Sequence, residues 1–299
     1  MNGMKRIVAT TDFSHGGESA LRRAVLLAKS AGAAVEVVHA VYLPPLEEAW
    51  RKLADKEGLS EAGLLEAAAQ RLGDLAAAVG QRLGLTPTPR VLQGRAPQAL
   101  AAWARESGAD LIVIGAHGEH FLLDLFVGST AMKTLRLATV PVLLVKQTPP
   151  FDYERIVIAT DFSPGARAAA ELAATLFPAA DLHLFHAYEV PFEREMYYAG
   201  ADDEAVDHYR RLGEAEARRQ IEAFADSLAD PRRYLRKMRH GYAPALINKY
   251  AAEIGADLVV MGSQGTSGIE ATLLGSVSSH LVTEFSGDML LVPAVGRGG

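Results

Sequence analysis

The sequence contains no cysteine among its 299 residues. This absence excludes disulfide bonds, thiolate zinc sites and cysteine nucleophiles. No apolar run is long enough to cross a bilayer, and the start of the chain lacks the apolar core of a signal peptide. We therefore expect a cytoplasmic protein with no membrane partner.

The chain also lacks an excess of positive charge, since its formal net charge at pH 7 is −6. Proteins that bind nucleic acid usually carry a basic footprint, so we expect no nucleic-acid partner. The most basic run, Arg232–His240, leaves an RNA-binding interpretation open. We favour an edge strand there, because Lys and Arg block the pairing of a sheet edge with other chains. The sequence has no Walker A loop either.

The chain does contain an internal repeat. The pattern G-x-x-G, nine residues, then G-S runs from Gly115 to Ser129 and again from Gly262 to Ser276. A strand-like opening that ends in T-D-F-S also occurs twice, at Thr11–Ser14 and Thr160–Ser163. A repeat of this length indicates duplication of a whole domain rather than a solenoid. The Pro-rich stretch near residues 148–150 predicts a boundary between domains 1–148 and 151–299.

Each half alternates short apolar runs with helical runs. In the first half we expect strands near residues 5–10, 34–41, 89–93, 110–115 and 141–145, and helices near 16–31, 60–83, 96–107 and 129–138. Strands that are apolar on both faces are typical of buried parallel sheets. The pattern therefore predicts a doubly wound α/β sheet in each half.

Each glycine loop follows a strand and precedes a helix, which favours a phosphate site at the helix N-terminus. Thr11-Asp12 and Gly115 end the first and fourth strands, so they would face one crevice if these strands are neighbours. A plain connecting loop with convenient glycines is the alternative for each copy. For Asp12 and Asp161 the alternative is an acid that stabilises the start of a helix.

These motifs together resemble the universal stress protein family, in its ATP-binding branch. The resemblance rests on the glycine pattern, on T-D-F-S, and on the closing strand P-V-L-L-V at Pro141–Val145. It covers nearly the whole chain as a tandem of two domains. It implies two doubly wound, parallel, five-stranded sheets that are Rossmann-like and similar to adenine nucleotide alpha hydrolases. It also implies an intramolecular pseudo-dimer about a pseudo-two-fold axis, with a homodimer of whole chains as a further assembly.

The resemblance implies one adenine-nucleotide site in each half. In the first half the site residues would be Thr11, Asp12, Val41, Gly115, His117, Gly118, Gly128, Ser129 and Thr130. In the second half they would be Thr160, Asp161, Tyr188, Gly262, Gly265, Gly275, Ser276 and Ser278. The ligand would be ATP, or AMP or ADP, and Mg²⁺ or Mn²⁺ on the phosphates would give Asp12 and Asp161 a further role. The differences at Val41 and Tyr188, and at His117 and Gln264, predict unequal affinities.

His117 and His120 lie close together in the first glycine loop, near Asp124. Two imidazoles and a carboxylate can bind zinc, but polar surface is the simpler interpretation because the second loop has no such pair. His117 alone can donate a hydrogen bond to a bound phosphate. The segments Pro44–Trp50 and Pro191–Tyr198 are expected to be rich in loops that cover the sites or bind partners.

No nucleophile stands at a suggestive spacing from a base in this sequence. We therefore expect a regulatory module of the stress response that binds ATP without catalysis. A weak ATPase or an adenylyl-transfer enzyme of the same fold is the first alternative. An interaction protein with empty sites is the second, and the intact glycine patterns argue against it.

Overall fold

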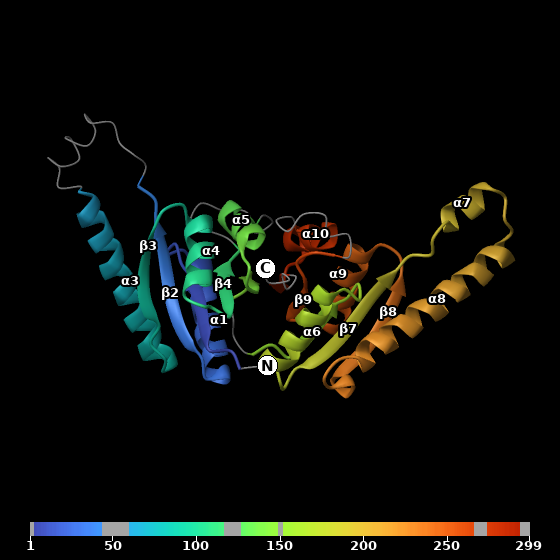
Figure 1. Cartoon of the computed structure of the whole chain (residues 1–299), viewed down its shortest axis with the longest axis horizontal. Helices are drawn as coiled ribbons and strands as arrows, with labels where there is room; N and C mark the ends of the chain where they lie inside the picture. The colour runs from blue at the N-terminus through green and yellow to red at the C-terminus, as the bar shows by residue number, and fades with distance from the viewer. Residues whose placement is uncertain (1–2, 44–59, 117–126, 149–151, 266–273, 294–299) are drawn as a thin grey trace, which may run out of the picture. The chain divides into compact units, whose positions relative to one another are not determined.

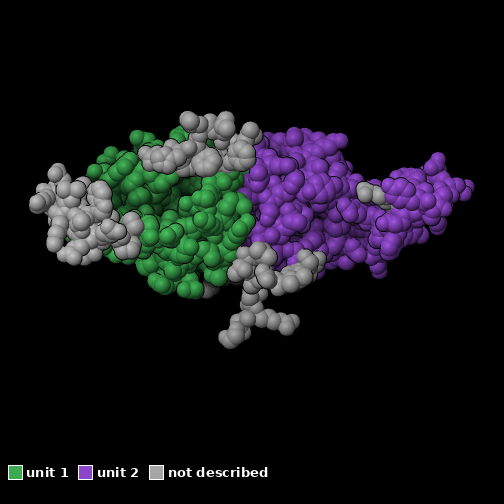
Figure 2. Space-filling view, turned by 90° about the horizontal axis from the view of Figure 1, so that it is seen from above, with its two compact units in different colours: residues 1–152 green, residues 153–299 purple. Residues whose placement is uncertain are grey.

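The computed structural model describes residues 3–43, 60–116, 127–148, 152–265 and 274–293. The chain divides into two compact units, Met1–Asp152 and Tyr153–Gly299, which Figure 2 colours separately. Each unit has its own strands and helices (Figure 1). No helix in the described part of the chain is long and apolar enough to span a membrane.

The first unit alternates strands and helices as the sequence predicts. Its elements are β1 (Arg6–Thr10), α1 (His15–Ala31), β2 (Ala34–Val41), α3 (Glu61–Leu83), β3 (Thr88–Gln93), α4 (Ala96–Glu106), β4 (Leu111–Gly115), α5 (Ser129–Leu137) and β5 (Val142–Val145). The strands are parallel, in the order β3-β2-β1-β4-β5. Successive connections run outward from β1 to β3 and then return past β1 to β4 and β5, so the strand order reverses between β1 and β4.

Right-handed crossovers in opposite directions place their helices on opposite faces of a sheet. Helices α1 and α3 therefore cover one face of the first sheet and contact each other. Helices α4 and α5 cover the other face and also pack together. This arrangement confirms the predicted doubly wound fold.

Local signals set the helix ends. Ser14 precedes α1, and its hydroxyl oxygen accepts a hydrogen bond from the N–H of Gly17 at 3.2 Å. At the other end Gly32 adopts a left-handed φ of 66° and donates its N–H to the carbonyl of Ala28. Gly84 ends α3 in the same way, with a φ of 74°. These caps fix where α1 stops before β2 and where α3 stops before β3.

The second unit repeats the topology. Its elements are β6 (Arg155–Ala159), α6 (Pro164–Leu176), β7 (Asp181–Tyr188), α7 (Glu193–Tyr198), α8 (Asp203–Asp226), the 3₁₀ turn η1 (Pro231–Arg233), β8 (Tyr234–His240), α9 (Ala243–Ile254), β9 (Leu258–Gly262), α10 (Ser276–Glu284) and β10 (Asp288–Val292). Its parallel strand order is β8-β7-β6-β9-β10. The segment Glu193–Tyr198, expected to be loop-rich, forms helix α7. Pro44–Trp50 lies outside the described residues.

The basic run of the sequence forms η1 and the edge strand β8, as the edge-strand interpretation predicts. Two of its arginines have acidic partners on neighbouring helices: Arg236 pairs with Glu222 at 2.8 Å, and Arg239 pairs with Glu253 at 2.5 Å. The helices beside this edge therefore neutralise part of its positive charge.

The core of each unit lies on both faces of the central strands. Ile7 and Val8 of β1 and Leu111 of β4 are fully buried, as are Ile156 of β6 and Leu258 of β9. Burial on both faces is what a parallel sheet covered by helices requires. Polar loop residues therefore lie beyond the carboxyl ends of these strands.

Candidate functional site

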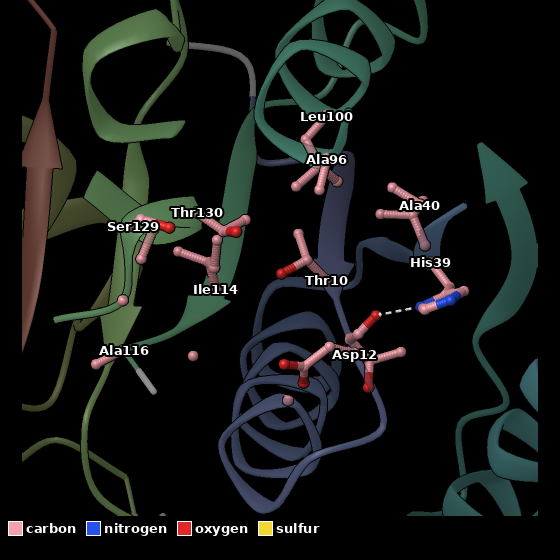
Figure 3. A pocket seen from close by; sticks show the side chains of 16 residues that line it. Thr10, Asp12, His39, Ala40, Ala96, Leu100, Ile114, Ala116, Ser129 and Thr130 are labelled. Carbon is pink, nitrogen blue, oxygen red and sulfur yellow. Dashed lines mark hydrogen bonds between the residues drawn. The ribbon is translucent and has the colours of Figure 1, made fainter. Parts of the chain in front are cut away.

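A cavity of about 360 Å³ opens at the carboxyl ends of β1 and β4 in the first unit. Strands β1 and β4 pair directly, so the predicted crevice at the reversal of strand order exists. Six of the predicted site residues line it: Thr11, Asp12, Gly115, Gly128, Ser129 and Thr130. In Figure 3, Ser129 and Thr130 lie on one side of the cavity and Ala40 lies on the other.

The remaining predicted residues of the first unit have other positions. His117 and Gly118 lie outside the described residues. Val41 ends β2 and does not line the cavity, to which β2 contributes Val38, His39 and Ala40. Sequence reasoning also missed the apolar wall made by Ala96 and Leu100 of α4 and by Ile114 of β4. No motif marks these three residues, and their apolar character was the one signal that the sequence offered.

The turn after β1 is built from side-chain hydrogen bonds to the backbone. The hydroxyl oxygen of Thr11 accepts the N–H of Phe13 at 3.0 Å. The carboxylate of Asp12 accepts the N–H of Ser14 at 3.0 Å and also the Ser14 hydroxyl. Such short-range bonds are typical of Thr, Asp and Ser in turns. They orient Asp12 at the mouth of the cavity.

Phe13 holds an unusual backbone conformation, with a φ of 65° in the left-handed region. Its ring packs against His39, with ring centroids 4.5 Å apart. The Nδ1 of His39 donates a hydrogen bond to the carbonyl of Thr11 at 2.8 Å, drawn as the dashed line in Figure 3. Backbone strain of this kind persists where surrounding contacts enforce it, often at functional sites. His39 and Phe13 are therefore positioning residues for the Thr11-Asp12 turn.

The second unit has the same arrangement of phenylalanine, histidine and backbone carbonyl. Phe162 has a φ of 66°, and its ring lies 4.3 Å from that of His186. The Nδ1 of His186 donates to the carbonyl of Thr160 at 2.8 Å. Burial lowers the pKa of His186, and the Thr160 carbonyl and the charge of Asp161 oppose that shift. The neutral imidazole with its proton on Nδ1 is the form that suits this site.

Helix α5 begins at the cavity without a side-chain cap. Gly128 is its N-cap residue, and no described side chain accepts a hydrogen bond from the first turn. The N–H of Gly128 itself donates to the carbonyl of Ala116 at 2.8 Å. The next N–H groups of an α-helix have no intrahelical acceptor, and the helix dipole makes this end positive. The arrangement can bind an anion.

Gly115 has a structural reason to be glycine. A Cβ at this position would lie 2.6 Å from the backbone carbonyl of Gly16, at the start of α1. The glycine therefore lets α1 approach the end of β4, whatever the site binds. Gly128 differs, because among the described residues a Cβ there would meet only the Ala116 oxygen, at 3.4 Å. Space in front of Gly128 thus belongs to the cavity.

A smaller cavity of about 150 Å³ opens at the equivalent place in the second unit. The predicted residues that line it are Thr160, Asp161, Gly262, Gly265, Gly275, Ser276 and Ser278. Tyr188 ends β7 and does not line it. The hydroxyl of Ser278 is buried and donates to the carbonyl of Gly262 at 3.1 Å. Ser278 is the third residue of α10, where α5 has Ala131, whereas Val277 occupies the position of Thr130.

The metal hypothesis concerns His117, His120 and Asp124, which lie outside the described residues. Within the residues that the structure describes, no group of three or more His, Asp or Glu side chains is arranged to hold a metal ion. In the first cavity Asp12 is the carboxylate among the described lining residues. It is the group that could reach a divalent cation carried by a ligand.

Comparison with known proteins identifies the family. The Universal stress protein family matches residues 3–146 and again residues 152–293. A universal stress protein of Thermus aquaticus is 33% identical over 146 residues, which cover 48% of this chain and 98% of that protein. One of Methanocaldococcus jannaschii is 29% identical over 151 residues, covering 49% of this chain and 84% of that protein.

A solved structure extends the likeness to the whole chain. The crystal structure of a universal stress protein from Archaeoglobus fulgidus has a TM-score of 0.63, with 19% sequence identity, and the match covers 97% of this chain and 98% of that chain. At this identity the likeness concerns the fold, which it shows for both units together. The chain belongs to the universal stress protein family, and it carries two copies of the family's domain.

Proposed function

We propose that this protein is a regulatory element of a stress response and that it binds an adenine nucleotide, with ATP as the expected ligand. The two domains, 1–148 and 151–299, each present a potential site. The observation that carries the proposal is the cavity of the first unit, which joins an apolar wall to an uncapped helix N-terminus. Its volume of about 360 Å³ falls within the range of small-molecule sites, about 300–1,000 Å³.

The phosphates would bind at the start of α5. The N–H groups of Ser129 and Thr130 belong to its first turn, and both residues are exposed at the cavity. An anion placed there would satisfy these donors and would gain from the helix dipole. Asp12 would then contact the phosphates through Mg²⁺ or Mn²⁺, because a bare carboxylate would repel them.

The base would lie at the apolar end. Val38 of β2 and Leu100 of α4 are buried side chains that line this part of the cavity. Apolar walls favour a flat aromatic ring, and few polar groups are needed to orient it. The cavity therefore suits a ligand with an apolar, planar end and an anionic end, which describes an adenine nucleotide.

A regulatory role follows from binding without an evident catalytic pair. A bound nucleotide changes a protein's state only through different affinities for two conformations or assemblies. Occupancy would thus report the nucleotide level to a partner protein. Membership of the universal stress protein family and the composition of the site support this role.

The proposal is tested with Ser129→Glu. A glutamate in the first turn interacts favourably with the helix dipole, so the fold should keep its stability. Its negative charge would occupy the anion site and repel the phosphates. We expect ATP affinity, measured by isothermal titration calorimetry, to fall by about tenfold or more, which corresponds to about 1.4 kcal/mol. The control Ser129→Ala keeps the backbone N–H groups and should bind nearly as the wild type does. Equal affinity of Ser129→Glu and wild type would contradict the phosphate position.

The same preparation separates the alternatives. Release of ADP over many turnovers, lost in Ser129→Glu, would favour a weak ATPase over a regulatory module. Retained ATP without turnover supports the regulatory module. No binding of ATP at millimolar concentration, and no rise in melting temperature, would instead support an interaction protein with empty sites.

A further inference from the structure

We infer that Phe185 closes the base end of the second site, so that the chain holds one adenine nucleotide, in its first unit. The inference rests on the proposed function and names the residue that decides which unit binds. The predicted difference in affinity was assigned to Val41 and Tyr188, which do not line the cavities. Val38 and Phe185 do line them, and we assign the difference in affinity to this pair.

Val38 and Phe185 occupy the same place in their units. Val38 lies opposite Thr10 in the pairing of β1 with β2, and Phe185 lies opposite Ala159 in the pairing of β6 with β7. Each is the fifth residue of an eight-residue strand with the same pattern of burial. Each lines the cavity of its unit and is at most 1% exposed.

The other apolar walls are nearly matched in size. Leu100 is the fifth residue of α4, and Ile247 is the fifth residue of α9. These isomeric side chains line the two cavities at equivalent positions. The large change in side-chain volume therefore falls on β7, where a benzyl group stands in place of an isopropyl group.

The Phe185 ring is fixed by its neighbours. It stacks on Tyr250 of α9, with ring centroids 4.9 Å apart and an angle of 22° between the planes. The Tyr250 hydroxyl is hydrogen-bonded to Nδ1 of His183 at 2.8 Å, and the Arg239 guanidinium lies 5.2 Å from the centre of its ring. A ligand that displaced Phe185 would have to disrupt this stack, which also holds α9 against β7.

In the first unit a hydrogen bond also joins the helix to the strand, but the residue at the position of Phe185 is Val38, which has no aromatic ring. Trp103 of α4 donates its indole N–H to Glu36 of β2 at 2.8 Å. These two residues stand where the second unit has Tyr250 and His183. The helix is thus held to the strand in both units, while the space beside Val38 stays open. The cavity of the first unit is also the larger of the two, at about 360 Å³ compared with about 150 Å³.

The test exchanges the two side chains and counts bound ATP by native mass spectrometry of the full chain. We expect one ATP per wild-type chain, two per chain in Phe185→Val, and none in Val38→Phe at a concentration that saturates the wild type. In Phe185→Val, addition of Ser276→Glu should return the count to one. Two ATP molecules per wild-type chain would overturn the inference and leave the proposed function intact. No ATP on the wild type would overturn the proposed function itself.

A second measurement needs no variant and does not depend on whether Phe185→Val folds. Hydrogen exchange of the wild type with and without ATP should show added protection in peptides that cover residues 10–17 and 128–137. The equivalent peptides, 159–166 and 275–284, should exchange at nearly the same rate with and without ATP. Equal added protection in both sets would contradict the assignment of the ligand to the first unit.

Discussion

The histidines beside the two sites, His39 and His186, each donate Nδ1–H to a backbone carbonyl at the end of a first strand. Each also supports the ring of a phenylalanine with a left-handed backbone. The imidazole therefore acts on the site through the conformation of the Thr-Asp turn. Proton transfer to a ligand is not required for this role.

His186 gives the folded state a dependence on pH. Burial lowers its pKa below the ordinary value of 6.5, so the folded state favours the neutral ring. The unfolded state then binds the proton more readily, and stability that is fully present above pH 6.5 is lost as the pH falls toward the lowered pKa. His183, whose pKa is also lowered by burial, acts in the same direction.

We therefore expect the free energy of unfolding to fall as the pH is lowered through 6.5, the ordinary pKa of histidine. His186→Asn keeps a donor near the Thr160 carbonyl but does not titrate, so it should flatten this dependence. Urea unfolding at several pH values measures both effects. An equally steep curve in the variant would show that other groups cause the loss. His208→Asn, on the outer part of α8, is the matched control.

Helix α3 contains three glycines, and two of them, Gly73 and Gly80, have opposite surroundings. A Cβ on Gly73 would meet no atom of the described residues within 4 Å, whereas a Cβ on Gly80 would lie 2.9 Å from the Cα of Thr86. Gly80 therefore allows the chain to pass closely over the helix on its way to β3. Gly73 only lowers the helical propensity of its turn.

Gly73→Ala should raise the free energy of unfolding by about 0.5–1 kcal/mol, because alanine is the better helix former. Gly80→Ala should lower it by about 1–3 kcal/mol, because backbone at Thr86 must move. Each substitution is the control for the other, and chemical denaturation compares them. A gain in stability in both variants would contradict the close packing at Gly80.

Helix α7 shows why a segment that reads as a loop can fold. The carboxylate of Glu193 pairs with Arg210 of α8 at 2.5 Å and with His240 of β8 at 2.9 Å. Both partners are distant in sequence, so no local pattern around Pro191 reveals them. The expectation of loops was wrong for this stretch, which forms a helix in contact with residues far from it in the sequence.

The molecule as a whole consists of two units, each with its own buried core. A ligand that binds one folded unit stabilises that unit by mass action, by about 2.7 kcal/mol at a concentration one hundred times its Kd. For a domain of this size that corresponds to a rise in melting temperature of about 5–10 °C.

In calorimetry we expect ATP to raise the transition that belongs to the first unit and to leave the other near its original temperature. Ser129→Glu should abolish the shift. A single transition that moves as a whole would show that the two units unfold together, and the shift would then not identify the occupied unit. The ATP counts of Val38→Phe and Phe185→Val, and the hydrogen exchange of the wild type, would still do so.

Much of the fold could be predicted because its signals are local or periodic. Ser14 and Gly32 mark the ends of α1 within a few residues, and the apolar runs at β1 and β4 match buried parallel strands. Thr11 and Asp12 were predicted at the site because strand ends gather at one edge of a parallel sheet. The pairing of whole domains about a pseudo-two-fold axis stays a prediction.

The sequence by itself determined the duplication and the alternation of strands and helices along the chain, because these follow from the internal repeat and from apolar periodicity. The tertiary fold decided that Val38 rather than Val41 lines the first cavity, and that Phe185 narrows the second. That choice depends on strand register and on the helix that packs across the sheet. These contacts join residues far apart in the chain, so no local pattern could reveal them.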